Sequence, residues 1–333
     1  MYIIVLFRKI AVVMRFYKHI VCNYMFVRRK AKLVLDEFAC AISPRLTIRL
    51  LNYGTYFPLF IAYAYGMLRG TKPSANESKR LIALGFMTVL FDELTDVYRY
   101  SADELRAFVT KKELVRPDNA ALERSILYIQ NWLMANCELY AQSETLLEQI
   151  LQAQIDSNEQ RNENIVYSRL MDITERKGGF TMQLLRTAFD GVPTKLESEF
   201  LYQLGALGQL ENDIFDCYKD FSEGIFTIPI QTKSISHVRK LYVEKCSTCF
   251  SQIQHLQFPI QNKRNFCYLL QFILARGMVA LGNLQALPNS DQGYKALSTM
   301  KRELLISDME KPINAWRLFR ITFFSYKNCT FVS

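Results

Sequence analysis

Apolar residues recur every three or four positions along most of the chain, which is the spacing of helices that bury one face. This pattern predicts helices over residues 3–35, 43–69, 75–99, 102–112, 117–141, 143–176, 178–190, 194–221, 233–256, 260–287 and 292–305. Gly, Pro, Asn and Asp predict the interruptions, in GTKPSANES (70–78), VRPDN (115–119), DGVPTK (190–195) and EGIFTIP (223–229). Thr194, followed three residues later by Glu197, has the pattern of a capping box, so a long helix should begin near residue 195. The predicted fold class is all-α.

Length and composition allow one large domain or two ordinary ones, and the lack of an internal repeat or a long polar linker favours a single helical domain. Half of the 333 residues are hydrophobic, whereas Gly and Pro number only 13 and 9, so the chain can bury a sizeable core with few interruptions. The eight Cys residues lack the spacing of a disulfide framework, which favours reduced thiols in a cytoplasmic protein.

The first 35 residues form a basic amphipathic segment, and residues 36–333 are predicted to form the main domain. Basic residues interrupt the apolar stripe too often for a membrane span or a signal peptide; they include Arg8, Lys9, Arg15, Lys18, Arg28, Arg29 and Lys30. Two interpretations remain open: a helix packed on the domain, or an interfacial helix that holds the protein at a membrane surface.

The formal net charge of +9 suits an anionic partner, such as a diphosphate or an anionic membrane. No nucleic-acid-binding motif is present, so we expect no nucleic-acid partner.

Acidic and amide side chains are concentrated in NDIFDCYKD, at residues 212–220. Asn212, Asp216 and Asp220 are four residues apart, so on a helix they share one face over about 12 Å. Aliphatic and aromatic residues surround them, which suggests oxygen ligands set into an apolar wall. The alternative is a solvated face in which Lys219 pairs with a carboxylate.

A second acidic pair, Asp92 and Asp96, ends the apolar helix that precedes it. Carboxylates at the end of a buried helix are costly unless a cation meets them. Mg²⁺ suits such a pair, because it takes carboxylate oxygens and water and bridges to substrate phosphates.

These two motifs resemble those of class I terpene synthases. NDIFDCYKD is similar to the second metal motif N-D-x-x-S-x-x-x-E, with Asn212, Asp213, Asp216 and Asp220 in place, and FDELTD is similar to the first motif D-D-x-x-D, with Asp92 and Asp96 at its outer positions. The motifs begin 120 residues apart, and the resemblance runs from about residue 50 to residue 285. It implies a single helical bundle around a central cavity, three Mg²⁺ ions, a prenyl diphosphate substrate and release of diphosphate with a terpene.

The second motif also resembles that of trans-prenyl diphosphate synthases, which share the isoprenoid synthase fold with terpene synthases and with squalene and phytoene synthases. ERKGGF, at residues 175–180, is similar to their K-T-G helix break, where Lys177 would contact diphosphate. However, only the single Arg99 follows Asp96, whereas chain-elongating enzymes have an Arg pair there, and their N-terminal G-K-R motif is missing. A one-substrate cyclisation is therefore the preferred prediction.

Besides Lys177, three basic residues are candidates for binding the diphosphate. Arg169 lies near the position of the diphosphate-sensing Arg of terpene synthases, and Lys219 lies within the second motif. Arg276 lies in the apolar stretch FILARGMVALG, where a buried Arg would need an anion.

Two other functions remain open. One is a prenyltransferase of the squalene/phytoene or polyprenyl diphosphate synthase type. The other is a catalytically silent helical protein that acts as a regulatory or membrane-surface module. A homodimer is compatible with all of these functions.

Overall fold

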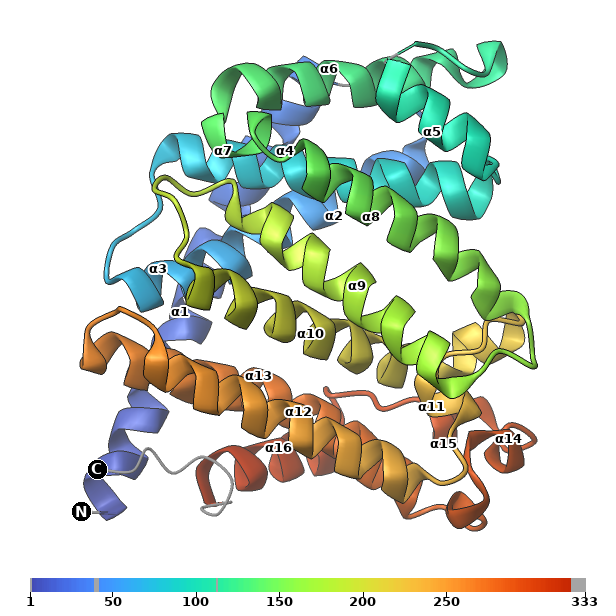
Figure 1. The fold of residues 1–333 in the computed structure, drawn as a ribbon. Helices are drawn as coiled ribbons and strands as arrows, with labels where there is room; N and C mark the ends of the chain where they lie inside the picture. Colours follow the sequence, from blue (N-terminus) through green and yellow to red (C-terminus); the bar gives the residue numbers. More distant parts are fainter. Residues whose placement is uncertain (1, 39–41, 112, 325–333) are drawn as a thin grey trace. The chain divides into compact units, whose positions relative to one another are not determined.

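The computed structural model describes residues 2–38, 42–111 and 113–324. Helices and turns account for the regular structure of these residues, and no strand occurs among them, which confirms the all-α class (Figure 1). The described residues form two compact units: unit 1 comprises residues 2–13, 156–183 and 193–324, and unit 2 comprises residues 14–38, 42–111, 113–155 and 184–192.

The helix α1 (Tyr2–Phe38) begins in unit 1 and continues in unit 2. The predicted basic N-terminal helix is therefore present and extends to Phe38. In unit 2, the side chain of Phe16 is buried against the rings of Phe60 and Tyr63, with centroid distances of 5.4 and 5.6 Å.

Unit 2 is otherwise built from seven α-helices in the described part of the chain: α2 (Pro44–Tyr56), α3 (Tyr63–Arg69), α4 (Ala75–Asp92), α5 (Ala102–Lys111), α6 (Ala120–Asn136), α7 (Glu138–Ala141) and α8 (Glu144–Asp156). Local sequence explains where they begin and end. Ser74 and Glu77 form a capping box at the start of α4. Gly70 ends α3 with a φ of 79°, a left-handed conformation that glycine adopts without strain. A π-helical turn, Phe57–Ala62, joins α2 to α3.

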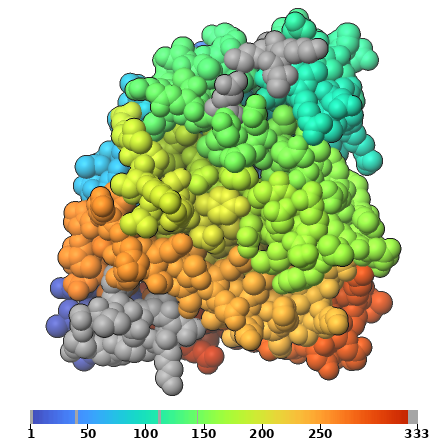
Figure 2. Space-filling view, viewed as in Figure 1, coloured from blue at the N-terminus to red at the C-terminus, as the bar shows by residue number. Residues whose placement is uncertain are grey.

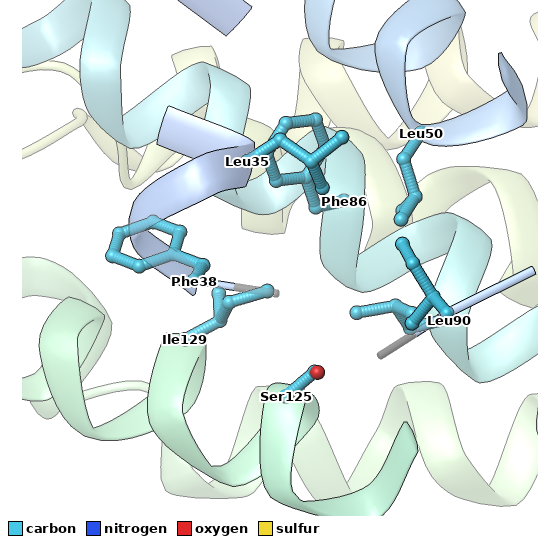
Figure 3. Close-up of a pocket in the computed structure, with 8 residues that line it drawn as sticks. Leu35, Phe38, Leu50, Phe86, Leu90, Ser125 and Ile129 are labelled. Carbon is cyan, nitrogen blue, oxygen red and sulfur yellow. The ribbon is translucent and has the colours of Figure 1, made fainter. Parts of the chain in front are cut away.

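The core of unit 2 encloses a small apolar pocket between α1, α2, α4 and α6 (Figure 3). Phe38, Leu50, Phe86 and Leu90 line it, and the hydroxyl of Ser125 donates a hydrogen bond to Ala121 O at 3.0 Å. The pocket has room for about one water molecule, so it belongs to the packed core and does not accommodate a prenyl chain.

Unit 1 contains most of α9 (Tyr167–Arg186), followed by α10 (Lys195–Ser222), α11 (Ile228–Gln231), α12 (Ile235–His255), α13 (Ile260–Gln285), α14 (Tyr294–Leu297), α15 (Arg302–Leu305) and α16 (Pro312–Phe324). The central helix α10 packs on both α12 and α13. Lys245 of α12 donates a hydrogen bond to Glu175 of α9 at 2.6 Å. In the space-filling view of Figure 2, the atoms of α9 and α12 adjoin on the surface.

By length and composition alone, α13 could cross a membrane, but 61% of its most apolar window is buried inside the structure. Burial of this kind is typical of a core helix, and α13 contacts α10, α12 and α16.

Several predicted elements differ from the structure. The predicted helix 143–176 is wrong, because a 3₁₀ turn, Ser157–Arg161, and an irregular stretch separate α8 from α9. Asn162 stabilises that stretch, since its side-chain oxygen accepts a hydrogen bond from the backbone N–H of Asn164 at 3.0 Å. The predicted helix 292–305 is also wrong, because the turn at residues 298–301 separates α14 from α15. The helix α16 was not predicted. A further difference, at Gly178, is described with the candidate site.

Candidate functional site

The second motif lies on the C-terminal half of α10, as predicted. Thr194 caps the helix, since its hydroxyl oxygen accepts a hydrogen bond from Glu197 N at 3.2 Å. Asn212 is exposed and Asp216 is half-buried. The side-chain amide of Asn212 donates a hydrogen bond to Oδ2 of Asp216 at 3.2 Å, so these two side chains share the predicted face.

Asp213 points toward α9 and is buried. Its carboxylate accepts hydrogen bonds from Gln209 Nε2 at 2.8 Å and from Thr174 Oγ1 at 3.3 Å. Burial raises the pKa of Asp213 to about 6, although these two donors and the positive charge of Lys177 oppose the shift. Asp213 is therefore a buried carboxylate held between two helices.

Asp220 lies one turn beyond Asp216 and is only 8% exposed. Within the described part of the chain, its carboxylate accepts no hydrogen bond and forms no direct ion pair. Burial, followed by the negative charges of Asp213 and Asp216, raises its pKa to about 7. Lys219 is exposed, and its charge opposes this shift only in part. This end of α10 thus carries more negative charge than the neighbouring protein groups neutralise.

Lys177 lies on the helix that faces the motif. It is half-buried, and its charge lowers the pKa of Asp213. Its ammonium group donates no hydrogen bond to the described residues. Within the described chain, Lys177 and Lys219 are the two predicted cations that act on carboxylates of the second motif without an ion pair to another acid.

Two glycines determine the approach of α9 to α10. A Cβ atom on Gly178 would lie 2.2 Å from Gly205 O, and one on Gly205 would lie 2.2 Å from Gly178 O. The backbones are therefore close enough that only glycine fits at either position. The helix α9 continues through Gly178 and Gly179, so the predicted helix break in ERKGGF is wrong. The glycines serve a close helix crossing, which places Thr174 beside Asp213.

Arg169 is engaged by protein carboxylates. It forms ion pairs with Asp156 at 3.1 Å, with Glu159 at 2.7 Å and with Asp172 at 2.7 Å. Arg176 also pairs with Asp156 and Asp172, at 2.6 and 2.7 Å, and so completes a network in unit 1. The hydrogen bonds that Arg169 donates to the carboxylate of Glu159 are the main cause that raises the pKa of Arg169. An anionic ligand of Arg169 would compete with three carboxylates.

Arg276 does not occupy the buried position that its apolar sequence suggested. Its side chain is 44% exposed and pairs with Oε1 of the buried Glu211 at 3.2 Å. Burial raises the pKa of Glu211, and Arg276 opposes that shift. The anionic partner of Arg276 is therefore the carboxylate of Glu211, which lies on α10 one residue before the second motif.

The first motif lies in unit 2, at the end of α4. Asp92 is the last residue of α4, and a π-helical turn, Glu93–Val97, follows it. Asp96 is exposed and accepts a hydrogen bond from Thr95 Oγ1 at 3.2 Å. Glu93, where terpene synthases have their second Asp, is buried and paired with Arg49. The charge of Glu93 is thus neutralised within the protein, whereas Asp96 is accessible.

Within the ranges that the structure describes, no three His, Cys, Asp or Glu residues lie close enough together to hold a metal ion by themselves. Asn212 is not one of these residue types, and Asp216 and Asp220 supply only two carboxylates on its face.

Sequence reasoning missed Glu211 as the partner of Arg276 and Thr174 as a partner of Asp213. A signal for the helix crossing was available, since glycines inside a helical pattern usually have a packing reason. The glycines Gly178, Gly179 and Gly205 fit that rule.

No family model matches the chain, and no curated protein matches it. The resemblance to isoprenoid synthases therefore depends on the two motifs and the helical layout.

Proposed function

We propose that the chain is a Mg²⁺-dependent class I isoprenoid synthase that ionises one linear prenyl diphosphate and cyclises its hydrocarbon chain to a terpene. The observation that carries this proposal is Asp220, which lies one turn from Asp216, is only 8% exposed, and accepts no hydrogen bond from the part of the chain that the structure describes. A buried carboxylate is costly unless it is protonated or meets a cation. A divalent cation at this end of α10 would keep Asp220 ionised near neutral pH.

The donor set fits Mg²⁺. Asn212, Asp216 and Asp220 offer amide and carboxylate oxygens, which are hard ligands, on successive turns of one helix. Mg²⁺ keeps several water ligands and often uses only one or two carboxylates together with substrate phosphates. A closed cluster of three acids is therefore not required. Asp92 and Asp96 of unit 2 are proposed ligands for further Mg²⁺ ions, of which the family resemblance implies three.

The side chains would act as follows. Bound Mg²⁺ would supply positive charge to stabilise the departing diphosphate. Asn212 orients Asp216 through their hydrogen bond, and Asp216 presents an accessible carboxylate. Lys177 is proposed to bind a diphosphate oxygen, because its ammonium group is not committed to a protein acceptor in the described chain. Lys219 is exposed at the edge of the motif and is a second candidate. Arg169 and Arg276 are weaker candidates, since each pairs with protein carboxylates.

A two-substrate prenyltransferase is the runner-up. The single Arg99 after the first motif disfavours it, because chain elongation uses an Arg pair at that position in the family.

The test is incubation of the purified protein with geranyl, farnesyl, geranylgeranyl and farnesylgeranyl diphosphates, with Mg²⁺ or with EDTA, followed by mass spectrometry of the organic extract. The proposal predicts a Mg²⁺-dependent hydrocarbon or alcohol from a single substrate. A matched control is Glu199→Gln, which removes an exposed acid near the start of α10 and should leave turnover unchanged. Product only after addition of isopentenyl diphosphate would establish an elongating prenyltransferase instead, and a product with twice the carbon number of its substrate would establish a prenyltransferase of the squalene/phytoene type. No product under either condition would contradict both enzyme proposals.

A further inference from the structure

The helix α1 carries an exposed apolar stripe on its unit 2 portion. Met14, Val21 and Met25 are 61%, 75% and 59% exposed. Val21 follows Met14 by seven residues, and Met25 follows Val21 by four. At about 100° per residue, the three side chains therefore lie within about 40° of one another around the helix axis. Ile3 and Phe7, earlier in the same helix, are also exposed. Large apolar side chains gathered on one face usually mark a binding surface.

The stripe belongs to a helix whose other face is already packed. Phe16, Val34, Leu35 and Phe38 are buried in unit 2. The helix therefore has its own apolar contacts with the protein, and the stripe is additional to them. Burial of the stripe is not needed to hold α1 in place.

The charges beside the stripe have one sign. Arg15, Lys18 and Arg29 are exposed, and among the described residues they form no ion pair. The chain contains eight Lys and Arg residues and no Asp or Glu before Asp36. Lys18 and Arg29 lie within about 60° of the stripe around the helix axis. A partner that covers the stripe therefore also contacts the cations along the edge of the stripe, which no carboxylate of the described chain neutralises.

We infer that α1 binds the surface of a lipid bilayer that contains anionic lipids, with Met14, Val21 and Met25 inserted among the acyl chains and Lys18 and Arg29 at the headgroups. Apolar insertion and attraction to anionic headgroups act together in interfacial helices of this kind. The uniform sign of the flanking charge selects this partner over a second copy of α1, since two such helices would repel each other. The inference does not depend on the proposed enzymatic function.

The test is co-sedimentation of the full-length protein with vesicles of phosphatidylcholine alone or with 30% phosphatidylserine. We expect binding to the anionic vesicles, weakened by 0.5 M NaCl, and little binding to the neutral ones. Lys18→Gln with Arg29→Gln should weaken binding about 25-fold, because each cation near an anionic surface contributes about 1 kcal/mol. Val21→Ser with Met25→Ser should weaken it at least about tenfold.

Matched controls are available on other exposed surfaces. Lys195→Gln with Lys240→Gln removes two exposed cations of unit 1. Val166→Ser with Val192→Ser removes two exposed apolar residues. Both double variants should bind like the parent protein, and circular dichroism should show the same helix content in all five proteins.

Three results would overturn the inference. The first is equal binding to neutral and anionic vesicles. The second is an equal loss of binding in the stripe variants and the control variants. The third is a dimer in analytical ultracentrifugation that dissociates in the Val21→Ser, Met25→Ser variant, which would assign the stripe to a second copy of the chain.

Discussion

The side-chain amide of Asn212 donates a hydrogen bond to Oδ2 of Asp216 across one turn of α10, at a distance of 3.2 Å. This bond fixes the orientation of the more accessible carboxylate of the second motif. Asp220, a further turn along, has no donor among the described residues. The motif therefore combines an oriented carboxylate with an unpaired one, which is the basis of the proposed metal site.

Removing either partner of that hydrogen bond should abolish catalysis without unfolding the helix. We predict that Asn212→Ala and Asp216→Ala each lower the rate of diphosphate release by about 100-fold or more, because they remove oxygen ligands of the proposed Mg²⁺ site, whose positive charge would stabilise the leaving group. Both residues have accessible side chains, so the far-ultraviolet circular dichroism should not change. The measurement is Mg²⁺-dependent release of diphosphate, with Glu199→Gln as the matched control. Retained turnover in either alanine variant would contradict the metal assignment.

The raised pKa of Asp220 predicts a specific dependence of stability on pH. Its pKa is about 7 in the folded protein, against an ordinary value of 3.8, so the folded state binds more protons than the unfolded state between these values. The contribution of Asp220 to stability is thus present at low pH and is lost as the pH rises through 7. Asp213, with a pKa of about 6, contributes in the same direction.

In EDTA at pH 8, we predict that Asp220→Asn raises the melting temperature by about 2 °C, because it removes a buried charge without changing the volume of the side chain. At pH 4 the difference between the variant and the parent protein should disappear. A lower melting temperature for the variant at pH 8 would show that the carboxylate has a stabilising partner.

The close crossing of α9 and α10 predicts opposite effects for two nearby glycines. Gly205→Ala would place a Cβ atom 2.2 Å from Gly178 O, so it should destabilise the protein by about 3 kcal/mol or more. A Cβ atom on the exposed Gly208 meets nothing within 4 Å. Gly208→Ala should therefore stabilise the helix by about 1 kcal/mol, since alanine is the better helix former. Chemical denaturation of both variants measures the two effects, and equal changes would contradict the observed crossing.

Arg276 is predicted to act mainly on stability through Glu211. Arg276→Met leaves Glu211 buried without its cation, which should cost about 1–2 kcal/mol after allowance for the solvent exposure of the Arg276 side chain. Adding Glu211→Gln should recover most of this loss, because the unpaired charge is then removed. Chemical denaturation of the single and double variants gives the coupling free energy between Arg276 and Glu211. Additive losses, together with weaker binding of diphosphate in Arg276→Met, would indicate that Arg276 serves the substrate instead.

Hydrophobic spacing was sufficient to predict the all-α class and the position of α10, since a 28-residue helix with a capped start and a Gly224 stop leaves little ambiguity. It could not predict which acids are paired, because pairing depends on residues distant in sequence: Arg49 lies 44 residues from Glu93, and Arg276 lies 65 residues from Glu211. The same limit explains the error at Gly178. A glycine pair has the same local signature at a helix break and at a close crossing, and only the position of Gly205 on another helix distinguishes them.

The most direct test of the metal assignment is titration calorimetry of the purified protein with inorganic diphosphate, in the presence and absence of Mg²⁺. We expect diphosphate to bind only when Mg²⁺ is present, and we expect Asp220→Asn and Asp216→Ala to weaken this binding at least about tenfold, whereas Glu199→Gln should bind like the parent protein. Binding that is independent of Mg²⁺, or equally tight in the Asp220→Asn and Asp216→Ala variants, would contradict the metal assignment.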